Sequence, residues 1–392
     1  MPGYKHSDVG VIPDDWDATQ LGGLVRITSG ASPSLFRFTG NGVPYFKVEQ
    51  LSNSEKYLSG TDTPYLFERG PSVPARSVVF AKRGAAIALN KVRILNQESF
   101  MDTNLMALTP QDGLDWEYLF YALGYIGLWR FADTTSVPQI NNKHVKPLAF
   151  PVPTVDEQRA IAKALSDADE LLATLDQVIA KKRDLKQATM QQLLTGKTRL
   201  PGFSGEWEVK RLGDICELKM GRTPPRLNPA FWGEGYVWLS IADLQSKLVS
   251  SSKEQVTEAA AATMELIPKG TLLMSFKLSI GRLCFAGCDL FTNEAICSFN
   301  SLTANADYLY YALERVDFSL YGKQAVKGYT LNKKSLKTVK VTLPTAAEQA
   351  AIAKVLSDMD AELSVLESRR DKTRNIKQAM MQELLTGKTR LV

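Results

Sequence analysis

One segment of the chain occurs twice. Residues 153–200 and 344–391 align without a gap at an offset of 191, and 29 of the 48 aligned positions are identical. Upstream of these segments the two halves agree only at scattered anchors, such as Trp16 over Trp207. Repetition over this length indicates a tandem duplication of one structural unit. We therefore expect a variable domain and a near-constant segment, followed by a second such pair.

The near-constant segments are predicted to be long helices. Each opens with a capping box, Thr154-Val-Asp-Glu157 or Thr345-Ala-Ala-Glu348, in which the threonine oxygen and the glutamate carboxylate bind free amides of the first turn. Apolar residues then follow at alternating steps of four and three, the spacing of a coiled-coil seam. The expected seam residues are Ile161, Leu165, Leu172, Leu175, Ile179, Ile352, Leu356, Met359, Leu363 and Leu366.

Two such helices in one chain bury their seams most simply against each other. We expect an antiparallel coiled coil with pseudo-twofold symmetry. In the alternative, each helix packs on its own variable domain, although a domain of this size would leave much of the helix uncovered. The expected domains are residues 1–152 (first variable domain), 153–199 (central helix), 200–343 (second variable domain) and 344–392 (C-terminal helix).

The octet LLTGKTRL closes both copies, at Leu193–Leu200 and Leu384–Leu391. Its Gly-Lys-Thr is similar to the end of a phosphate-binding loop. Such a loop also needs a second glycine, five residues before the glycine of this triplet. Gln191 and Gln382 stand at those positions. Glycine directly after the last apolar residues is typical of a helix C-terminus. The octet is therefore interpreted as a helix stop.

Composition bears on several functional classes. The net charge of +5 and the pI near 8.8 permit nucleic-acid binding without establishing it. The sequence has no apolar run of membrane-spanning length and no apolar N-terminal stretch, so we expect a cytoplasmic protein that is not bound to a membrane. Cys284 and Cys288 have a C-x3-C spacing without a nearby histidine, so no metal site is expected.

The variable domains are predicted to be mixed α/β (α+β). Short β-rich runs at 77–81, 271–276 and 339–343 are separated by clusters of Gly, Pro and Asn. Residues 116–132 and 307–322 have the pattern of amphipathic helices. Their aromatic residues are interpreted as core residues and not as platforms for base stacking.

Basic and amide residues recur at matched places in the loops of both halves. Lys and Arg contact phosphates and guanine edges and Asn suits adenine, so such loops can read duplex DNA. A single loop of this kind is more often solvated surface, and the recurrence is what favours a function. The candidate DNA-binding residues are Lys82, Arg83, Asn90, Lys91, Arg93, Asn141, Lys143, Lys219, Arg222, Arg226, Lys277, Lys327, Tyr329, Lys333 and Lys334.

The order of these segments resembles a known family. A variable domain, a helix that begins P-T-x-x-E-Q-x-x-I-A and ends L-L-T-G-K-T-R-L, and then both again, is similar to the specificity subunit of type I restriction-modification enzymes. The opening of the second domain, Gly221–Leu244, is also similar to the recognition domains of that family. The corresponding Gly30–Leu51 keeps a looser version, so base contacts are harder to place in the first domain.

The resemblance implies a non-catalytic protein whose variable domains are target recognition domains, each reading one half of a bipartite site in double-stranded DNA. The helices would set the spacer and dock two modification subunits, which methylate adenine, and two restriction subunits would join them. No cofactor or metal is expected on this chain, because S-adenosylmethionine, ATP and Mg²⁺ would be bound by the partner subunits. Because the two domains share only scaffold positions, the two half-sites are expected to differ.

Two other hypotheses stay open. In the first, the chain is a coiled-coil scaffold whose two domains bind proteins. In the second, it is a free-standing adenine methyltransferase, because Asn228-Pro-Ala-Phe231 is close to the N-P-P-[YF] motif of such enzymes. The second proline of the motif is missing and no glycine-rich cofactor motif precedes it. We interpret this match as a coincidence.

Overall fold

The computed structural model of the chain describes residues 3–35, 38–133, 137–277, 279–325 and 328–391. It divides into two compact units. Unit 1 comprises Met1–Asp176 and Ser368–Val392, and unit 2 comprises Gln177–Glu367. Each of the two expected helices contributes one part to each unit, so the boundaries of the units differ from those of the expected domains.

Both near-constant segments are helices, as predicted. Helix α3 spans Val155–Leu193 and helix α8 spans Ala346–Leu384. Each is followed by a glycine in the left-handed region, Gly196 at φ 68° and Gly387 at φ 70°. Other residues are strained in that conformation, so the glycine closes the helix and the octet is confirmed as a helix stop.

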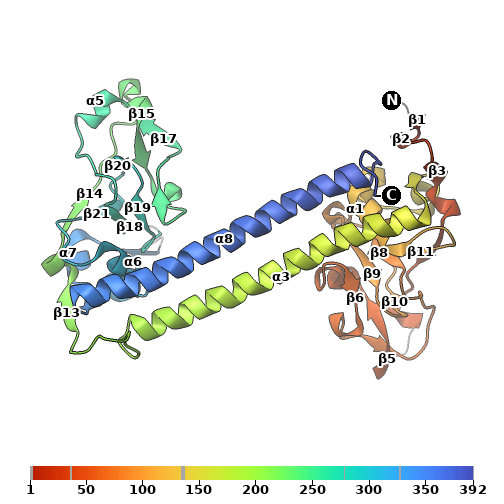
Figure 1. The fold of residues 1–392 in the computed structure, drawn as a ribbon, viewed down its shortest axis with the longest axis horizontal. Coiled ribbons are helices and arrows are strands. Elements are labelled where there is room, and N and C mark those ends of the chain that lie inside the picture. Colours follow the sequence, from red (N-terminus) through yellow and green to blue (C-terminus); the bar gives the residue numbers. More distant parts are fainter. Residues whose placement is uncertain (1–2, 36–37, 134–136, 278, 326–327, 392) are drawn as a thin grey trace. The chain divides into compact units, whose positions relative to one another are not determined.

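Within each unit, a part of α3 pairs with a part of α8 (Figure 1). The ion pairs between the two helices are Asp169–Lys377 and Asp176–Arg370 in unit 1, and Lys182–Glu362, Arg183–Glu367 and Lys186–Asp360 in unit 2. Within a unit, residues further along α3 meet residues earlier in α8. The paired parts are therefore antiparallel.

The predicted seam residues fall into two groups. Leu175, Ile179 and Leu363 are buried in the middle of the helices, and Leu172, Met359 and Leu366 are half-buried there. The others belong to domain cores. The core of unit 1 holds Ile161 and Leu165 together with Leu384 and Leu385, and the core of unit 2 holds Ile352 and Leu356 together with Leu193 and Leu194. The start of each helix thus packs on its own domain, which agrees in part with the alternative in which the helices pack on the variable domains. The knobs-into-holes packing of a coiled coil stays a prediction.

The domain in unit 1 is built on a five-stranded sheet with the order β4-β11-β8-β9-β6. These strands are β4 (Val25–Ser29), β6 (Tyr57–Leu58), β8 (Val78–Ala81), β9 (Val92–Leu95) and β11 (Leu105–Pro110). All pairs are antiparallel except β6–β9. A second sheet has the order β10-β5-β7, and two further sheets are the strand pairs β1–β2 and β12–β3. Their strands are β1 (Tyr4–Ser7), β2 (Gly10–Pro13), β3 (Asp17–Gln20), β5 (Phe38–Phe46), β7 (Leu66–Phe67), β10 (Phe100–Met101) and β12 (Ala149–Val152).

The domain in unit 2 repeats this plan with the order β14-β21-β18-β19-β16. These strands are β14 (Glu217–Met220), β16 (Leu248–Val249), β18 (Leu272–Ser275), β19 (Leu283–Ala286) and β21 (Ile296–Asn300). The smaller sheet has the order β17-β15-β20, and the pairs are β13–β24 and β22–β23. Their strands are β13 (Glu208–Arg211), β15 (Trp232–Leu239), β17 (Glu254–Val256), β20 (Phe291–Thr292), β22 (Lys323–Ala325), β23 (Gly328–Thr330) and β24 (Lys340–Leu343). The strands predicted at 77–81, 271–276 and 339–343 are confirmed as β8, β18 and β24.

The predicted amphipathic helices are shorter than their patterns. Helix α1 spans Trp116–Ile126 and helix α6 spans Ala306–Glu314, and a 3₁₀ turn follows each of them. In unit 1 the helix stops because Gly127 takes φ 75°. Tyr118 and Tyr121 are buried, as predicted for core residues, whereas Tyr125 near the end of α1 is 40% exposed. The remaining short helices are α2 (Asn142–Val145), α4 (Leu212–Ile215), α5 (Glu258–Ala261) and α7 (Lys333–Lys337).

The starts of α3 and α8 carry only half of the predicted capping boxes. Thr154 Oγ1 accepts a hydrogen bond from the amide of Glu157 at 3.3 Å, as expected for a cap. The carboxylate of Glu157 does not return to the amide of Thr154, because the Arg390 guanidinium and the Trp16 indole bind it. The glutamate therefore anchors the end of α8, a role that the capping pattern did not indicate.

Candidate nucleic-acid interface

Two loops that carry predicted DNA-binding residues are joined in the same way in both units. In unit 1 the amide of Ile140 donates to Lys82 O at 2.8 Å, which brings the loop after β8 beside the loop before α2. In unit 2 the amide of Leu331 donates to Phe276 O at 3.2 Å, which joins the loop after β18 to the loop before α7. The sequence patterns could not show this contact, since the joined loops are more than 50 residues apart.

The joined loops present basic and amide side chains to solvent. In unit 1 Arg83, Asn141 and Lys143 are exposed, and in unit 2 Lys333 and Lys334 are exposed. Lys82 and Lys277 are half-buried, and burial lowers the pKa of Lys82. Each unit therefore has a basic loop junction, which we define as residues 82–84 with 138–144 in unit 1 and residues 276–277 with 331–334 in unit 2.

Lys143 has an acidic neighbour at this junction. Its Nζ lies 3.2 Å from Asp133, and His144 Nε2 lies 3.2 Å from the same carboxylate. The hydrogen bond from Lys143 holds the pKa of Asp133 below its usual value, so the carboxylate is ionised at neutral pH. A phosphate approaching Lys143 would therefore exchange partners with an exposed carboxylate.

A second group of predicted residues gathers around the loop that follows β14 in unit 2. Arg226 lies 4.0 Å from the ring centroid of Trp232 and binds Glu254 at 2.5 Å. The hydrogen bond from Thr223 lowers the pKa of Glu294, and the charges of Lys277 and Arg226 lower it further. Glu294 thus links this loop electrostatically to the basic loop junction of unit 2.

The other two basic residues of this group are held by neighbours on the same side. Arg222 Nη1 donates to Thr263 O at 3.2 Å, and Lys219 binds Glu265. Both side chains reach solvent in part, with Arg222 exposed and Lys219 half-buried. Exposed contacts such as Lys219–Glu265 contribute little to stability, so a DNA phosphate could replace the carboxylate at a small cost in free energy.

Three predicted residues of the first domain do not lie at the basic loop junction and have structural roles. Arg93 is 7% exposed, and its Nε donates to Ser54 O at 2.6 Å. The Asn90 side chain donates to Gly124 O and accepts from the amide of Leu128, so it caps the end of α1. Lys91 Nζ donates to Ser52 Oγ at 2.7 Å. The polar groups of Arg93 and Asn90 are thus engaged inside the domain, and a DNA contact by either residue stays a prediction.

Two further predictions lie outside what the structure describes. Lys327 falls outside the described residues, and for Tyr329 only the backbone is described, in β23. Among the described residues no group of His, Cys, Asp and Glu is arranged to hold a metal ion. No helix in the described ranges combines the length and the apolar character that a membrane crossing needs.

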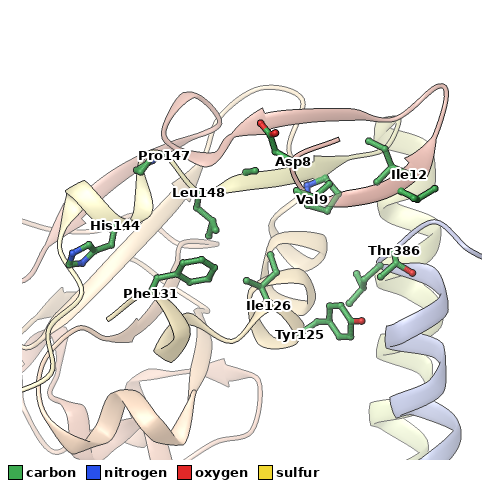
Figure 2. Close-up of a pocket in the computed structure, with 14 residues that line it drawn as sticks. Asp8, Val9, Ile12, Tyr125, Ile126, Phe131, His144, Pro147, Leu148 and Thr386 are labelled. Carbon is green, nitrogen blue, oxygen red and sulfur yellow. The ribbon is translucent and has the colours of Figure 1, made fainter. Parts of the chain in front are cut away.

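An apolar pocket of about 440 Å³ lies in unit 1, beside the β1–β2 hairpin. Figure 2 shows Tyr125, Ile126, Phe131 and Leu148 around it, with Thr386 beyond the end of α8. The pocket borders the basic loop junction at His144, and none of the predicted DNA-binding residues that the structure describes lines it. Its described lining contains no Lys, Arg, Asn or Gln side chain, which are the groups that most often contact DNA.

Comparisons with known proteins place the whole chain near one family. A family model described as the type I restriction modification DNA specificity domain matches twice, at residues 13–181 and 204–373. A Methanocaldococcus jannaschii protein assigned as the type I restriction enzyme MjaX specificity subunit is 24% identical over 99% of this chain and 97% of its own length. The MjaVIII specificity subunit of the same organism is 21% identical over 97% of this chain and 94% of its own length.

A solved structure has the same fold. The crystal structure of a type I restriction-modification system S subunit from M. genitalium is 18% identical to this chain and has a TM-score of 0.61. The match covers 94% of this chain and 96% of the M. genitalium chain. At this level of identity the likeness establishes the fold alone.

Proposed function

The chain belongs to the family of type I restriction modification DNA specificity domains, and from that premise we propose that it reads DNA sequence for a type I restriction-modification enzyme. In this proposal each of the two domains binds one half of a bipartite site in double-stranded DNA. The family model matches residues 13–181 and 204–373, so most of each match lies in one unit, which supports one reading domain in each.

The observation that carries the proposal is the basic loop junction in each unit. The same backbone contact joins equivalent loops in both domains, and exposed Lys, Arg and Asn side chains gather there. The side chains themselves differ. Arg83 in unit 1 occupies the place of Lys277 in unit 2, and Asn142 the place of Lys333. Different side chains on one scaffold support two different half-sites, because base edges are read by individual side chains.

The remaining parts of the proposal concern the partners. We infer that the chain is a non-catalytic subunit of the cytoplasm, that α3 and α8 set the spacer between half-sites, and that the helices dock two modification subunits. Two restriction subunits complete the assembly. S-adenosylmethionine, ATP and Mg²⁺ are assigned to these partners, since the chain has no glycine-rich nucleotide motif. The long continuous helices support this arrangement because a helix without Pro or Gly resists bending.

Selection from a library of random duplexes tests the proposal. The full chain, with its modification subunits, should enrich two unlike half-sites separated by a spacer. Arg83→Ala and Lys277→Ala should each weaken binding, by about 1–3 kcal/mol where the side chain contacts a base. A base contact relaxes one position of one half-site, whereas a phosphate contact weakens binding at all sequences and flattens the salt dependence.

Lys354→Ala is the matched control, because Lys354 lies on α8 in an exposed pair with Asp358, away from the basic loop junction. This variant should bind as the unchanged protein does. If the chain enriches no bipartite sequence, the proposal is wrong, and the scaffold hypothesis with two protein-binding domains takes its place.

A further inference from the structure

A nearly buried lysine ties the first domain to helix α3. Lys56 lies in the loop before β6, and its side chain is 11% exposed. Its Nζ donates to Glu117 Oε1 at 2.5 Å, to Tyr121 Oη at 3.1 Å and to Ser166 Oγ at 2.9 Å. Glu117 and Tyr121 belong to α1, whereas Ser166 belongs to α3. The ammonium group thus has a partner for each of its three donors, on two different elements.

The tyrosine extends this link to helix α8. Tyr121 Oη donates to Asp169 of α3 at 2.7 Å, and Asp169 also binds Lys377 of α8. Burial and the hydrogen bond to Asp169 raise the pKa of Tyr121, so its phenol stays protonated and remains a donor. One continuous set of polar contacts therefore joins the loop before β6, α1 and both long helices within unit 1.

Unit 2 contains the same arrangement. Lys247, in the loop before β16, donates to Tyr311 Oη at 2.7 Å and to Ser357 Oγ at 3.2 Å, and it lies 3.6 Å from Asp307. Tyr311 donates to Asp360 of α8, and Asp360 binds Lys186 of α3. Burial and the bond to Asp360 raise the pKa of Tyr311 as well.

We call these residues the domain–helix cluster, one in each unit. The clusters are Lys56, Glu117, Tyr121, Ser166, Asp169 and Lys377 in unit 1, and Lys247, Asp307, Tyr311, Ser357, Asp360 and Lys186 in unit 2. Five of the six residue types are the same in both, and the sixth differs only as Glu and Asp. Half of each cluster lies in a variable domain whose sequence has otherwise diverged. Whatever the cluster does is therefore needed by both domains, independent of the sequence that each one reads.

The chemistry of the cluster suits a positioning role. Apolar contacts hold a domain on a helix but have no preferred direction. Charged hydrogen bonds require particular distances and angles, and they cost free energy when one partner moves away inside a buried site. The loop that carries Lys56 is itself fixed to the sheet, because Arg93 Nε binds Ser54 O and Lys91 binds Ser52. The cluster thus connects the sheet firmly to the helices.

We propose that the domain–helix cluster fixes the angle at which each domain is held on the helices, and that this angle helps to select the spacer length between the half-sites. The inference rests on the proposed function in DNA reading. The cluster residues are positioning residues, since they act through the orientation of the domain. Their loss should therefore leave the sequence of each half-site unchanged.

The test is a panel of duplexes that share the half-sites enriched by the unchanged chain and differ only in spacer length. We expect Lys56→Met and Lys247→Met to bind the same half-sites. The preference for the best spacer over spacers one base pair longer or shorter should fall about fivefold, the ratio that one such hydrogen bond supports. Lys56→Arg, which keeps the charge, should restore part of the preference.

Lys163→Met and Lys354→Met are the matched controls, because these lysines form exposed pairs with Asp167 and Asp358 on the same helices. They should keep the spacer preference. If a lysine variant fails to fold, Tyr121→Phe and Tyr311→Phe decide the question, since each removes only a hydroxyl group.

An unchanged spacer preference in the folded cluster variants would overturn the inference, and so would a changed half-site sequence, which would mean that the cluster contacts DNA. Failure of the unchanged chain to enrich any half-site is a different result, because it contradicts the proposed function itself.

Discussion

Arg390 binds the carboxylate of Glu157 through Nε at 2.6 Å and Nη2 at 2.9 Å, although 233 residues separate them. Glu157 is fully buried, and Arg390 also binds Asp15 at 2.7 Å. Unit 2 has the equivalent pair, with Arg199 Nε and Nη2 each 2.6 Å from Glu348. The arginine of each LLTGKTRL octet thus anchors the end of one long helix to the start of the other.

Arg390→Met should destabilise unit 1 strongly. It leaves the buried carboxylate of Glu157 without its cation, and breaking such a pair costs about 3–5 kcal/mol when both groups are buried. Because Arg390 is partly exposed, we expect about 2–4 kcal/mol by urea unfolding. Lys388→Met is the control, since Lys388 is an exposed residue of the same octet. Equal stability of the two variants would show that the pair does not hold the helix ends.

Trp16→Phe should cost more stability than Trp207→Phe. The two residues occupy equivalent positions, but Trp16 Nε1 donates to Glu157 at 2.8 Å, whereas the buried Nε1 of Trp207 has no hydrogen-bond partner among the residues that the structure describes. Removing the indole donor of Trp16 takes one hydrogen bond from the carboxylate of Glu157, which should lower the free energy of unfolding by about 1.5–3 kcal/mol. Removing the unbonded donor of Trp207 removes the cost of burying that donor without a partner. Thermal unfolding of the two variants measures the difference. A greater loss for Trp207→Phe would contradict this reading of the two sites.

The helices were predictable because their signals are local. Apolar spacing, absence of Pro and Gly, and a terminal glycine are all properties of neighbouring residues, and α3 and α8 have the predicted ends. The role of Glu157 was missed because its partner, Arg390, lies at the far end of the chain. The only available signal was that both residues are identical in the two copies.

The surroundings of the candidate DNA-binding residues could not be predicted from the sequence, for a related reason. Arg93 and Arg83 both stand in basic stretches of the sequence, but Arg93 lies on β9 and is buried, whereas Arg83 lies in a loop and is exposed. Arg93 on β9 faces the loop 52–56, whose fold depends on contacts with distant residues. Arg83 lies in a loop joined to residues 138–140 and stays exposed. Side-chain direction is set by this packing, which residue type alone does not encode.

Arg93→Ala and Arg83→Ala should therefore have opposite effects. Arg93→Ala removes the bond to Ser54 O and should lower stability by about 1–3 kcal/mol. It should leave the half-site sequence of the folded protein unchanged. Arg83→Ala should leave stability within about 0.5 kcal/mol and weaken DNA binding. Unfolding curves and duplex binding, measured on both variants, separate the two roles. Loss of DNA binding by a fully stable Arg93→Ala protein would instead show that Arg93 contacts DNA.

Three of the four cysteines should resist thiol reagents in the folded protein. Burial raises the pKa of Cys216 to about 11 and that of Cys284 and Cys297 to about 12. Cys288 is partly exposed. Because the thiolate is the reactive form, an alkylating reagent at pH 8 should modify Cys288 first and the others only after unfolding. Mass spectrometry of peptides identifies the modified residues. Rapid modification of Cys284 in the folded protein would contradict its burial.

The same thiols should make unit 2 less stable in alkaline solution. Their pKa values are higher in the folded than in the unfolded chain, where the ordinary value is 9.0. The folded state therefore binds more protons above pH 9, and this contribution to stability is complete below pH 9 and declines as pH rises toward 12. Cys284→Ala should reduce the decline, as measured by thermal unfolding between pH 8 and pH 11. An identical pH profile for the variant would exclude Cys284 as a source.

Lengthening both helices tests whether they set the spacer. Within unit 2, Lys182 of α3 faces Glu362 of α8, so seven-residue insertions after Lys181 and after Glu362 lengthen the pair at facing positions. Seven residues add about 10 Å and keep the apolar heptad in register, with only ~20° of added rotation. We expect the half-site sequences to stay the same and the spacer to grow by about three base pairs of ~3.4 Å. Five-residue insertions at the same places are the control, because they move the seam out of register and should destabilise the pair. Methylation or binding that keeps the original spacer in the folded seven-residue variant would show that the helices do not determine the distance.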